Sequence, residues 1–304
     1  MPVANGDGRK PLDPFECVLC LVHGRLQRVA GDLMLEARVL ARIAQLVAEW
    51  PSRTDVFVRS YEYLESLLGG VDLYADRKRR LNEAGLSVAR RLPLGEMSSA
   101  EISGLMASAN GVDISMPGYR PDDSRVFKRL GDQPYWLGLG HSEFERLLAA
   151  AETLVLVLDN AGEAAVDIAA ARELAERAGA ELVLVARERP YEVDVTLQEA
   201  AALADVLAPE ARLIGTGGRL PVFHPRASSE ARSLLRGHGK LVLVKGIANL
   251  EAFMDYPWSV SGGARAVFLL RAKCTPLARL FDVALAEPVV VSDNWVRERL
   301  KEGS

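Results

Sequence analysis

Apolar positions recur every three to four residues through the first 150 positions, which is the spacing of amphipathic helices. Pro51, the Gly69-Gly70 pair and Pro93 interrupt this spacing and separate the predicted helices. The predicted helices are Glu16–Ala30, Leu33–Trp50, Asp55–Leu68, Tyr74–Arg91 and Ala100–Ala109. The stretch Pro117–His141 is rich in Gly, Pro, Asp and Tyr, and we expect an irregular connection or lid there.

After about residue 150, short continuous apolar runs alternate with helical spacing, a pattern typical of buried parallel strands joined by helices. The predicted strands are Thr153–Leu158, Glu181–Ala186, Arg212–Ile214, Lys240–Val244, Ala264–Leu270 and Pro288–Val291. The predicted helices between them are 162–179, Thr196–Leu207 and Ser228–Arg236. The pattern predicts a three-layer α/β/α sandwich with a mostly parallel, Rossmann-like sheet, preceded by an all-helical N-terminal domain. We expect a flexible leader over 1–14, a helical domain over 15–150 and an α/β metal-binding catalytic domain over 151–304.

Composition and charge narrow the function classes. The chain is 49% hydrophobic and 26% charged with a formal net charge of -4, which is ordinary for a globular protein. No basic stripe suits a nucleic-acid backbone, and the one dense basic run, Arg77–Arg80, is expected to be a solvated helix face. No apolar stretch is long enough for a membrane span, and the N-terminus has no signal-peptide core. With three cysteines and no secretion signal, we expect reduced thiols and a cytoplasmic protein.

Polar side chains follow three of the predicted strands. Asp159 and Asn160 end the first strand, Asp194 lies eight residues past the second, and Lys245 ends the fourth. Ligands of open parallel sheets bind beyond the carboxyl ends of the strands. Two carboxylates and an amide oxygen suit a hard divalent cation, and a lysine opposite would neutralise phosphoryl charge. The alternative is structural: Asp159 or Asn160 could cap the helix that follows, and Asp194 could cap the helix near Thr196.

An ordered set of short motifs resembles the metal-dependent damage-control phosphatases, formerly domain of unknown function 89, in their prokaryotic and archaeal branch. The resemblance covers nearly the whole chain after the leader. It rests on Cys17-Val-Leu-Cys20, Gly70-Val-Asp-Leu-Tyr74 with Lys78 and Asn82, Ala109-Asn-Gly-Val-Asp113, Asp159-Asn-Ala-Gly-Glu163, Asp194-Val-Thr196, Lys245-Gly-Ile-Ala-Asn249-Leu-Glu251 and Lys273-Cys274.

The resemblance implies specific roles for these residues. Metal ligation falls to Asp159, Asn160 and Asp194, and phosphate contact to Lys245. Substrate contacts are implied for four further side chains, and we expect the amides at the start of the helix near Gly162 to hold phosphate oxygens. The four side chains are Asn110, Asp113, Asn249 and Glu251. Val193 stands where the family usually has Asn, and Ala248 where it usually has Gly.

The implied reaction is hydrolysis of a small phosphorylated metabolite, such as a sugar phosphate or a damaged phospho-metabolite, by metal-activated water. The cation would be Mg²⁺, Mn²⁺, Co²⁺ or Ni²⁺, and the protein a monomer or homodimer. Asp159 could instead be a nucleophile that forms an aspartyl-phosphate. Two other functions remain open: an S-adenosylmethionine-dependent methyltransferase, and a non-catalytic metabolite-binding protein.

For several other features we favour a purely structural role over a role in binding or catalysis. Cys17, Cys20 and His23 share a helix face and could bind zinc with Cys274, or form a reversible disulfide, but small buried residues on a helix face are the simpler interpretation. Gly215–Gly218 is expected to be a turn rather than a phosphate loop. His224, in a proline-rich loop, is expected to face solvent.

Overall fold

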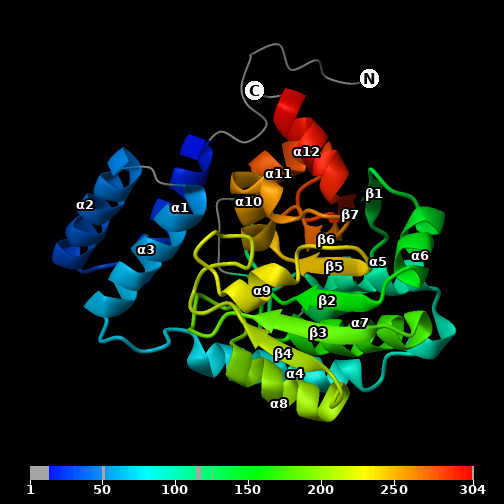
Figure 1. The fold of residues 1–304 in the computed structure, drawn as a ribbon. Coiled ribbons are helices and arrows are strands. Elements are labelled where there is room, and N and C mark those ends of the chain that lie inside the picture. Colours follow the sequence, from blue (N-terminus) through cyan, green and yellow to red (C-terminus); the bar gives the residue numbers. More distant parts are fainter. Residues whose placement is uncertain (1–13, 50–51, 114–117, 125, 303–304) are drawn as a thin grey trace.

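The computed structural model describes residues 14–49, 52–113, 118–124 and 126–302, so the expected leader lies almost wholly outside the described residues. The described residues form one seven-stranded sheet of order β1-β7-β6-β5-β2-β3-β4, with helices on both faces (Figure 1). Neighbouring strands pair in parallel except β6 and β7, which are antiparallel. The strands are β1 Tyr135–Leu137, β2 Thr153–Val157, β3 Glu181–Ala186, β4 Arg212–Gly215, β5 Lys240–Lys245, β6 Arg265–Arg271 and β7 Pro288–Ser292. The predicted α/β class with a mostly parallel sheet is confirmed.

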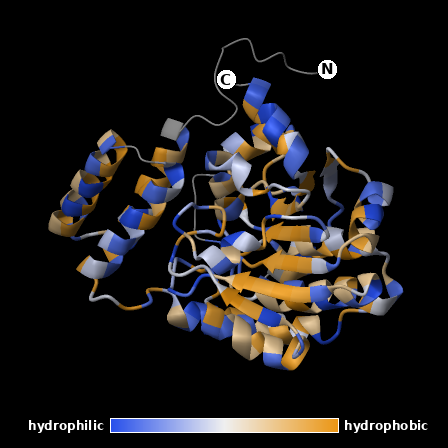
Figure 2. Ribbon diagram, in the orientation of Figure 1, coloured by the Kyte–Doolittle hydropathy of each residue, from blue (hydrophilic) through white to orange (hydrophobic). Residues whose placement is uncertain are grey.

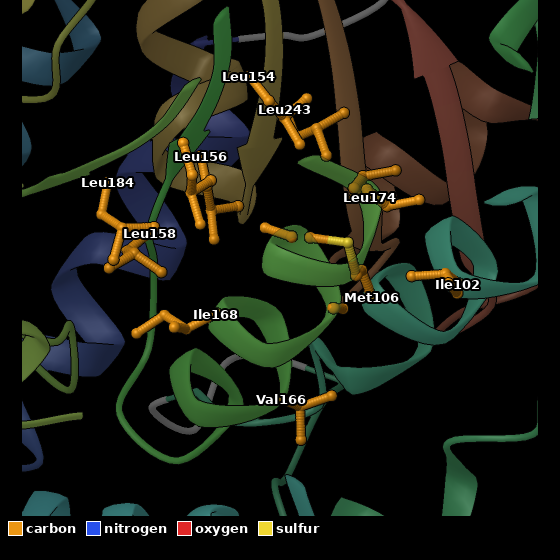
Figure 3. Close-up of a cluster of buried hydrophobic side chains, with 14 of the residues drawn as sticks. Ile102, Met106, Leu154, Leu156, Leu158, Val166, Ile168, Leu174, Leu184 and Leu243 are labelled. Atoms are coloured by element: carbon orange, nitrogen blue, oxygen red, sulfur yellow. The ribbon is translucent and has the colours of Figure 1, made fainter. Parts of the chain in front are cut away.

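Leucine and valine alternate along the three central strands, and this alternation builds two cores. Leu154 of β2 is in register with Leu182 of β3 and Leu241 of β5, so leucines form rows across the sheet. Valines form the rows on the opposite face, because successive strand side chains point to opposite sides. Figure 2 shows these strands as a continuous apolar layer, and Figure 3 shows leucines of this face in one buried cluster with Ile102, Met106, Val166 and Ile168.

Helices cover both the leucine face and the valine face of the sheet. The leucine face is covered by α4 Ala75–Ala89, α5 Ser99–Ala109, α6 His141–Ala149, α7 Glu163–Ala178 and α8 Leu197–Leu207. The valine face is covered by α9 Ser229–Ser233, α10 Ile247–Asp255, α11 Thr275–Phe281 and α12 Asp293–Glu302. The region before residue 150 therefore supplies β1 and α4–α6 to the layers around the sheet. The expectation of an irregular segment over Pro117–His141 was wrong at β1, which is too short to show a periodicity.

The first three helices, α1 Pro14–Leu26, α2 Leu33–Glu49 and α3 Arg53–Leu67, form a separate group beside the sheet (Figure 1). They have their own small core, which includes Leu21, Ile43, Leu46 and Leu64. None of the helices in the described part of the chain is long and apolar enough to cross a membrane.

Charged pairs join this helical group to the rest of the molecule. Arg53 lies 3.4 Å from Asp255, and Arg279 lies 2.7 Å from Glu16. Arg219 pairs with Glu65. Apolar packing adds to these ion pairs, because Val58 and Tyr61 of α3 lie in one buried cluster with Tyr191.

The expected surface positions of His224 and Lys78 were wrong, whereas Arg79 and Arg80 of the same basic run are exposed as expected. His224 is only 2% exposed, because its loop packs under α3 and its Nε2 lies 3.2 Å from Asp55 Oδ2. Lys78, within the basic run, is fully buried and pairs with Asp72 at 2.7 Å and Glu199 at 3.0 Å. In both cases an acid distant in sequence compensates the buried side chain.

Candidate active site

The order in which the chain adds strands to the sheet reverses at β2, and this reversal locates the candidate site. From β2 the chain adds β3 and β4 on one side, then returns to add β5 and β6 on the other. The carboxyl ends of strands at such a switch point leave a crevice where ligands bind. Asp159 follows β2 and Gly246 follows β5, so both lie at this crevice.

Backbone pairing brings the three predicted metal ligands together. Asn160 and Asp194 form an isolated antiparallel bridge. On either side of it, Ala161 N donates to Val193 O at 2.9 Å and Val195 N donates to Asp159 O at 2.8 Å. The loop after β3 is thereby fixed in register against the loop after β2.

Helix capping does not account for these three residues. The N-cap of α7 is Gly162, without a side-chain cap bond, and the N-cap of α8 is Thr196, in a capping box with Glu199. The capping alternative is therefore excluded for the side chains of Asp159, Asn160 and Asp194.

A cavity of about 80 Å³ adjoins this loop pair. Five of the predicted site residues line it: Asp113, Asp159, Asn160, Asp194 and Glu251. Residues of the α1–α3 group, including Cys17, Cys20 and Arg25, form the opposite wall. The volume suffices for a few water molecules at ~30 Å³ each.

Two amides and a second carboxylate surround Asp159. Asn110 Nδ2 donates to Asp159 Oδ2 at 3.1 Å and to Glu163 Oε1 at 2.7 Å. Asn160 Nδ2 donates to the same Asp159 oxygen at 2.6 Å. Asn110 therefore reaches the site by orienting two acids rather than by lining the cavity. Glu163 was not among the predicted site residues, although it belongs to the same motif as Asp159.

Three carboxyl groups of the candidate site, those of Asp159, Glu163 and Asp194, are buried, and their pKa values are raised. Burial raises the pKa of Asp159, raises that of Glu163 to about 8 and, with Arg187 opposing, raises that of Asp194 to about 7. Repulsion from Asp159 raises the pKa of both Glu163 and Asp194 further. Among the described residues, Glu163 Oε2 is buried without a hydrogen-bond partner.

This donor set fits a divalent cation. Such a cation would lower the cost of the mutually repelling buried carboxylates, and carboxylate and amide oxygens are the ligands that hard cations prefer. Within the ranges that the structure describes, no three His, Cys, Asp or Glu side chains are arranged to hold a metal ion. A cation between Asp159 and Asp194 would therefore also need an oxygen outside that set, and the Asn160 amide offers one.

Lys245 does not line the cavity. It continues the row of Leu241 and Leu243, so the two-residue period of β5 directs it toward α5 and α7. Its Nζ lies 3.1 Å from Asp167 Oδ1 and donates to the Met106 carbonyl. Lys273, at the end of β6, pairs with Asp113 at 2.6 Å. The predicted phosphate contact of Lys245 remains a prediction.

Asn249 and Gly162 donate hydrogen bonds to other groups of the protein and so hold the loops around the candidate site. Asn249 Nδ2 donates to Leu158 O at 3.2 Å and to Lys245 O at 2.9 Å, and so ties the end of β2 to the end of β5. The Gly162 amide donates to Asn82 Oδ1 at 2.7 Å. That amide is already used, so a phosphate bound there would have to displace Asn82.

The cysteines are free thiols on the wall of the same cavity. Cys17 Sγ donates to Glu251 Oε1 at 3.9 Å. Burial raises the pKa of Cys17 to about 12 and that of Cys20 to about 11, so both thiols stay protonated at neutral pH.

Replacing Asp167 by asparagine is expected to flatten the dependence of stability on pH. Burial raises the pKa of Asp167 to about 7, although Lys245 opposes the shift. Between pH 4 and 7 the folded chain keeps a proton on Asp167 that the unfolded chain has released, so the contribution of Asp167 to stability falls as pH rises. The Asp167→Asn variant lacks this loss, which amounts to at most about 1.4 kcal/mol per pH unit.

Urea unfolding of metal-free protein at pH 5, 6, 7 and 8 measures this difference. The quantity compared is the slope of the free energy of unfolding against pH. Its absolute value is not compared, because the substitution also leaves Lys245 without its carboxylate partner. Asp205→Asn, at an exposed position of α8, controls for the chemical change. Parallel curves for wild type and Asp167→Asn would contradict the prediction.

Comparison with known proteins decides the family. The model of the damage-control phosphatase ARMT1-like domain matches residues 14–289. The chain belongs to this family. The resemblance inferred from the motifs is therefore confirmed, and membership in the damage-control phosphatase family supports phosphatase activity on damaged metabolites.

Two comparisons with one relative agree with the assignment. The damage-control phosphatase PH1575 of Pyrococcus horikoshii is 25% identical over 279 residues, which cover 87% of this chain and 92% of that protein. A crystal structure of the same DUF89 family protein superimposes with a TM-score of 0.71 at 24% identity, covering 90% of this chain and 96% of the other. The damage-control phosphatase fold therefore extends over nearly the whole chain.

Proposed function

We propose that this damage-control phosphatase hydrolyses small phosphomonoesters, such as sugar phosphates or damaged phospho-metabolites, with a bound Mg²⁺, Mn²⁺, Co²⁺ or Ni²⁺. The observation that carries the proposal is the pairing of the loops after β2 and β3. It gathers Asp159, Asn160 and Asp194 on one cavity at the switch point of the sheet.

In this proposal some residues would bind the cation and others orient the residues that bind it. Asp159, Asn160 and Asp194 would hold the cation, which when bound would polarise a phosphoryl oxygen and lower the pKa of a water. Arg187 Nε donates to Asp194 Oδ2 at 2.5 Å and Asn110 donates to Asp159, so each carboxylate is fixed by a neighbour. Lys245 and Lys273 supply buried positive charge behind the carboxylates.

Attack by water is favoured over attack by Asp159 itself. Asp159 Oδ2 accepts hydrogen bonds from two side-chain amides, which draw electron density from the carboxylate. Of the other acids on the cavity wall, Asp113 and Glu251 would face the substrate.

The test is turnover of p-nitrophenyl phosphate and a panel of sugar phosphates by metal-stripped protein, with each of the four cations added back. Turnover that requires added cation supports the proposal. Cation and phosphate binding without turnover would indicate a metabolite-binding protein. The methyltransferase alternative is disfavoured because the loop after β2 lacks a glycine-rich run and its Gly162 amide is engaged by Asn82.

A further inference from the structure

Arg25 reaches the candidate site from the separate helical group. It lies in the last turn of α1, is 1% exposed and lines the cavity with Asp159, Asn160 and Asp194. The motifs that carry the family resemblance do not include Arg25, and no other arginine lines this cavity in the described part of the chain. A fully buried arginine in a cavity wall calls for a specific role, because its desolvation is costly.

Every arm of the guanidinium is held. Nε donates to Ser60 Oγ at 3.2 Å and one terminal nitrogen donates to Phe57 O at 3.0 Å, so α3 fixes the orientation of the side chain. The other terminal nitrogen pairs with Glu192. Arg25 thus joins α1 and α3 to the loop after β3.

Glu192 has a backbone conformation that needs support. Its φ is +47°, in the left-handed region that residues other than glycine rarely adopt. Such a conformation is strained and persists where surrounding contacts impose it. Glu192 lies two positions before Asp194, in a turn closed by Asp194 N donating to Tyr191 O at 3.0 Å.

The same turn sets the position of Asp194. Val193, immediately after Glu192, accepts the bond from Ala161 N that begins the pairing with the loop after β2. A relaxed Glu192 would rotate the chain just before this pairing. The direction of the Asp194 carboxylate relative to Asp159 and Asn160 therefore depends on the turn.

From this geometry we propose that Arg25 is a positioning residue for the metal ligands: its pair with Glu192 holds the Tyr191–Asp194 turn in the left-handed conformation that presents Asp194 beside Asp159 and Asn160. Metal affinity is thereby coupled to docking of α1–α3. The inference rests on the proposed metal site, and it assigns Arg25 a role before any substrate binds.

The first measurement is Mn²⁺ binding to the full chain by electron paramagnetic resonance, without substrate. Arg25→Met is expected to raise the dissociation constant for Mn²⁺ by about 10-fold or more, the scale seen when residues that orient ligands are lost. Arg279→Met is the matched control, because it removes another ion pair between α1 and the body, with Glu16. Its dissociation constant is expected to stay within about twofold of wild type.

A second pair of variants separates backbone geometry from charge and does not depend on Arg25→Met folding. Glu192→Gly and Glu192→Ala both remove the ion pair, but glycine adopts a positive φ without strain. We expect Glu192→Gly to bind Mn²⁺ within about threefold of wild type, and Glu192→Ala to weaken binding as Arg25→Met does.

Several results would overturn the proposal. One is wild-type affinity in Arg25→Met, and another is equal weakening by Glu192→Gly and Glu192→Ala. Failure of the wild-type chain to bind Mn²⁺ would overturn the proposed metal site as well. Binding by wild type with unchanged binding by Arg25→Met would overturn this inference alone.

Discussion

Asp159→Asn is expected to lower kcat/KM for p-nitrophenyl phosphate by at least about 10²-fold to 10³-fold at saturating cation. The substitution keeps the shape of the side chain and removes the charge that would hold the cation. A catalytic metal supplies several kcal/mol of transition-state stabilisation, and each 1.4 kcal/mol corresponds to about tenfold in rate.

The stability of the metal-free Asp159→Asn variant is not expected to fall with its activity. Asp159 is buried among other acids, and burial together with repulsion from Asp113 raises its pKa. A neutral amide at this position relieves that repulsion, so the metal-free variant is expected to unfold at the same or higher urea concentration than wild type.

Initial rates and urea unfolding of the two proteins, with Asp205→Asn as the surface control, check both expectations. Retention of activity within about tenfold would remove Asp159 from the metal set. A large loss of stability would show instead that Asp159 has a structural role.

Gly246→Ala is expected to abolish activity and to destabilise the fold by about 2–4 kcal/mol. Gly246 has a φ of +81°, and a Cβ on it would lie 1.9 Å from Asp159 Oδ2. The substitution therefore combines backbone strain with displacement of the central carboxylate.

Gly179→Ala separates these two effects. Gly179, at the C-terminus of α7, has a φ of +65°, but a Cβ there would meet nothing within 4 Å. It should cost about 1 kcal/mol of stability through backbone strain and leave the rate unchanged. Equal activity losses in the two variants would contradict the proposed contact between Gly246 and Asp159.

Local patterns predicted the central part of the fold well. The alternating leucine and valine runs of β2, β3 and β5 identify buried strands without reference to other parts of the chain. The position of Asp159 and Asn160 follows from the end of one such run. Asp194 could be grouped with them because carboxyl ends of parallel strands meet at one edge.

Features that depend on contacts between distant segments were not predicted. The pair of Arg25 with Glu192 joins residues 167 positions apart, and no periodicity in α1 marks Arg25 as buried. β1 is three residues long and is stabilised by pairing with β7. The orientation of Lys245, in contrast, follows from the local sequence. The two-residue period of β5 places Lys245 on the same face as Leu243, toward α7.

The repeated leucine and valine rows of β2, β3 and β5 have a consequence for strand alignment. A slip of two residues between two of these strands would keep leucine against leucine, so core packing alone discriminates weakly between the alignments. It would also displace one strand end by ~6.6 Å and carry Asp159 away from Gly246 or Asp194. The polar loops of the candidate site therefore also mark the correct alignment of the sheet, and substitutions there should be selected against twice, once for the proposed catalysis and once for accurate folding.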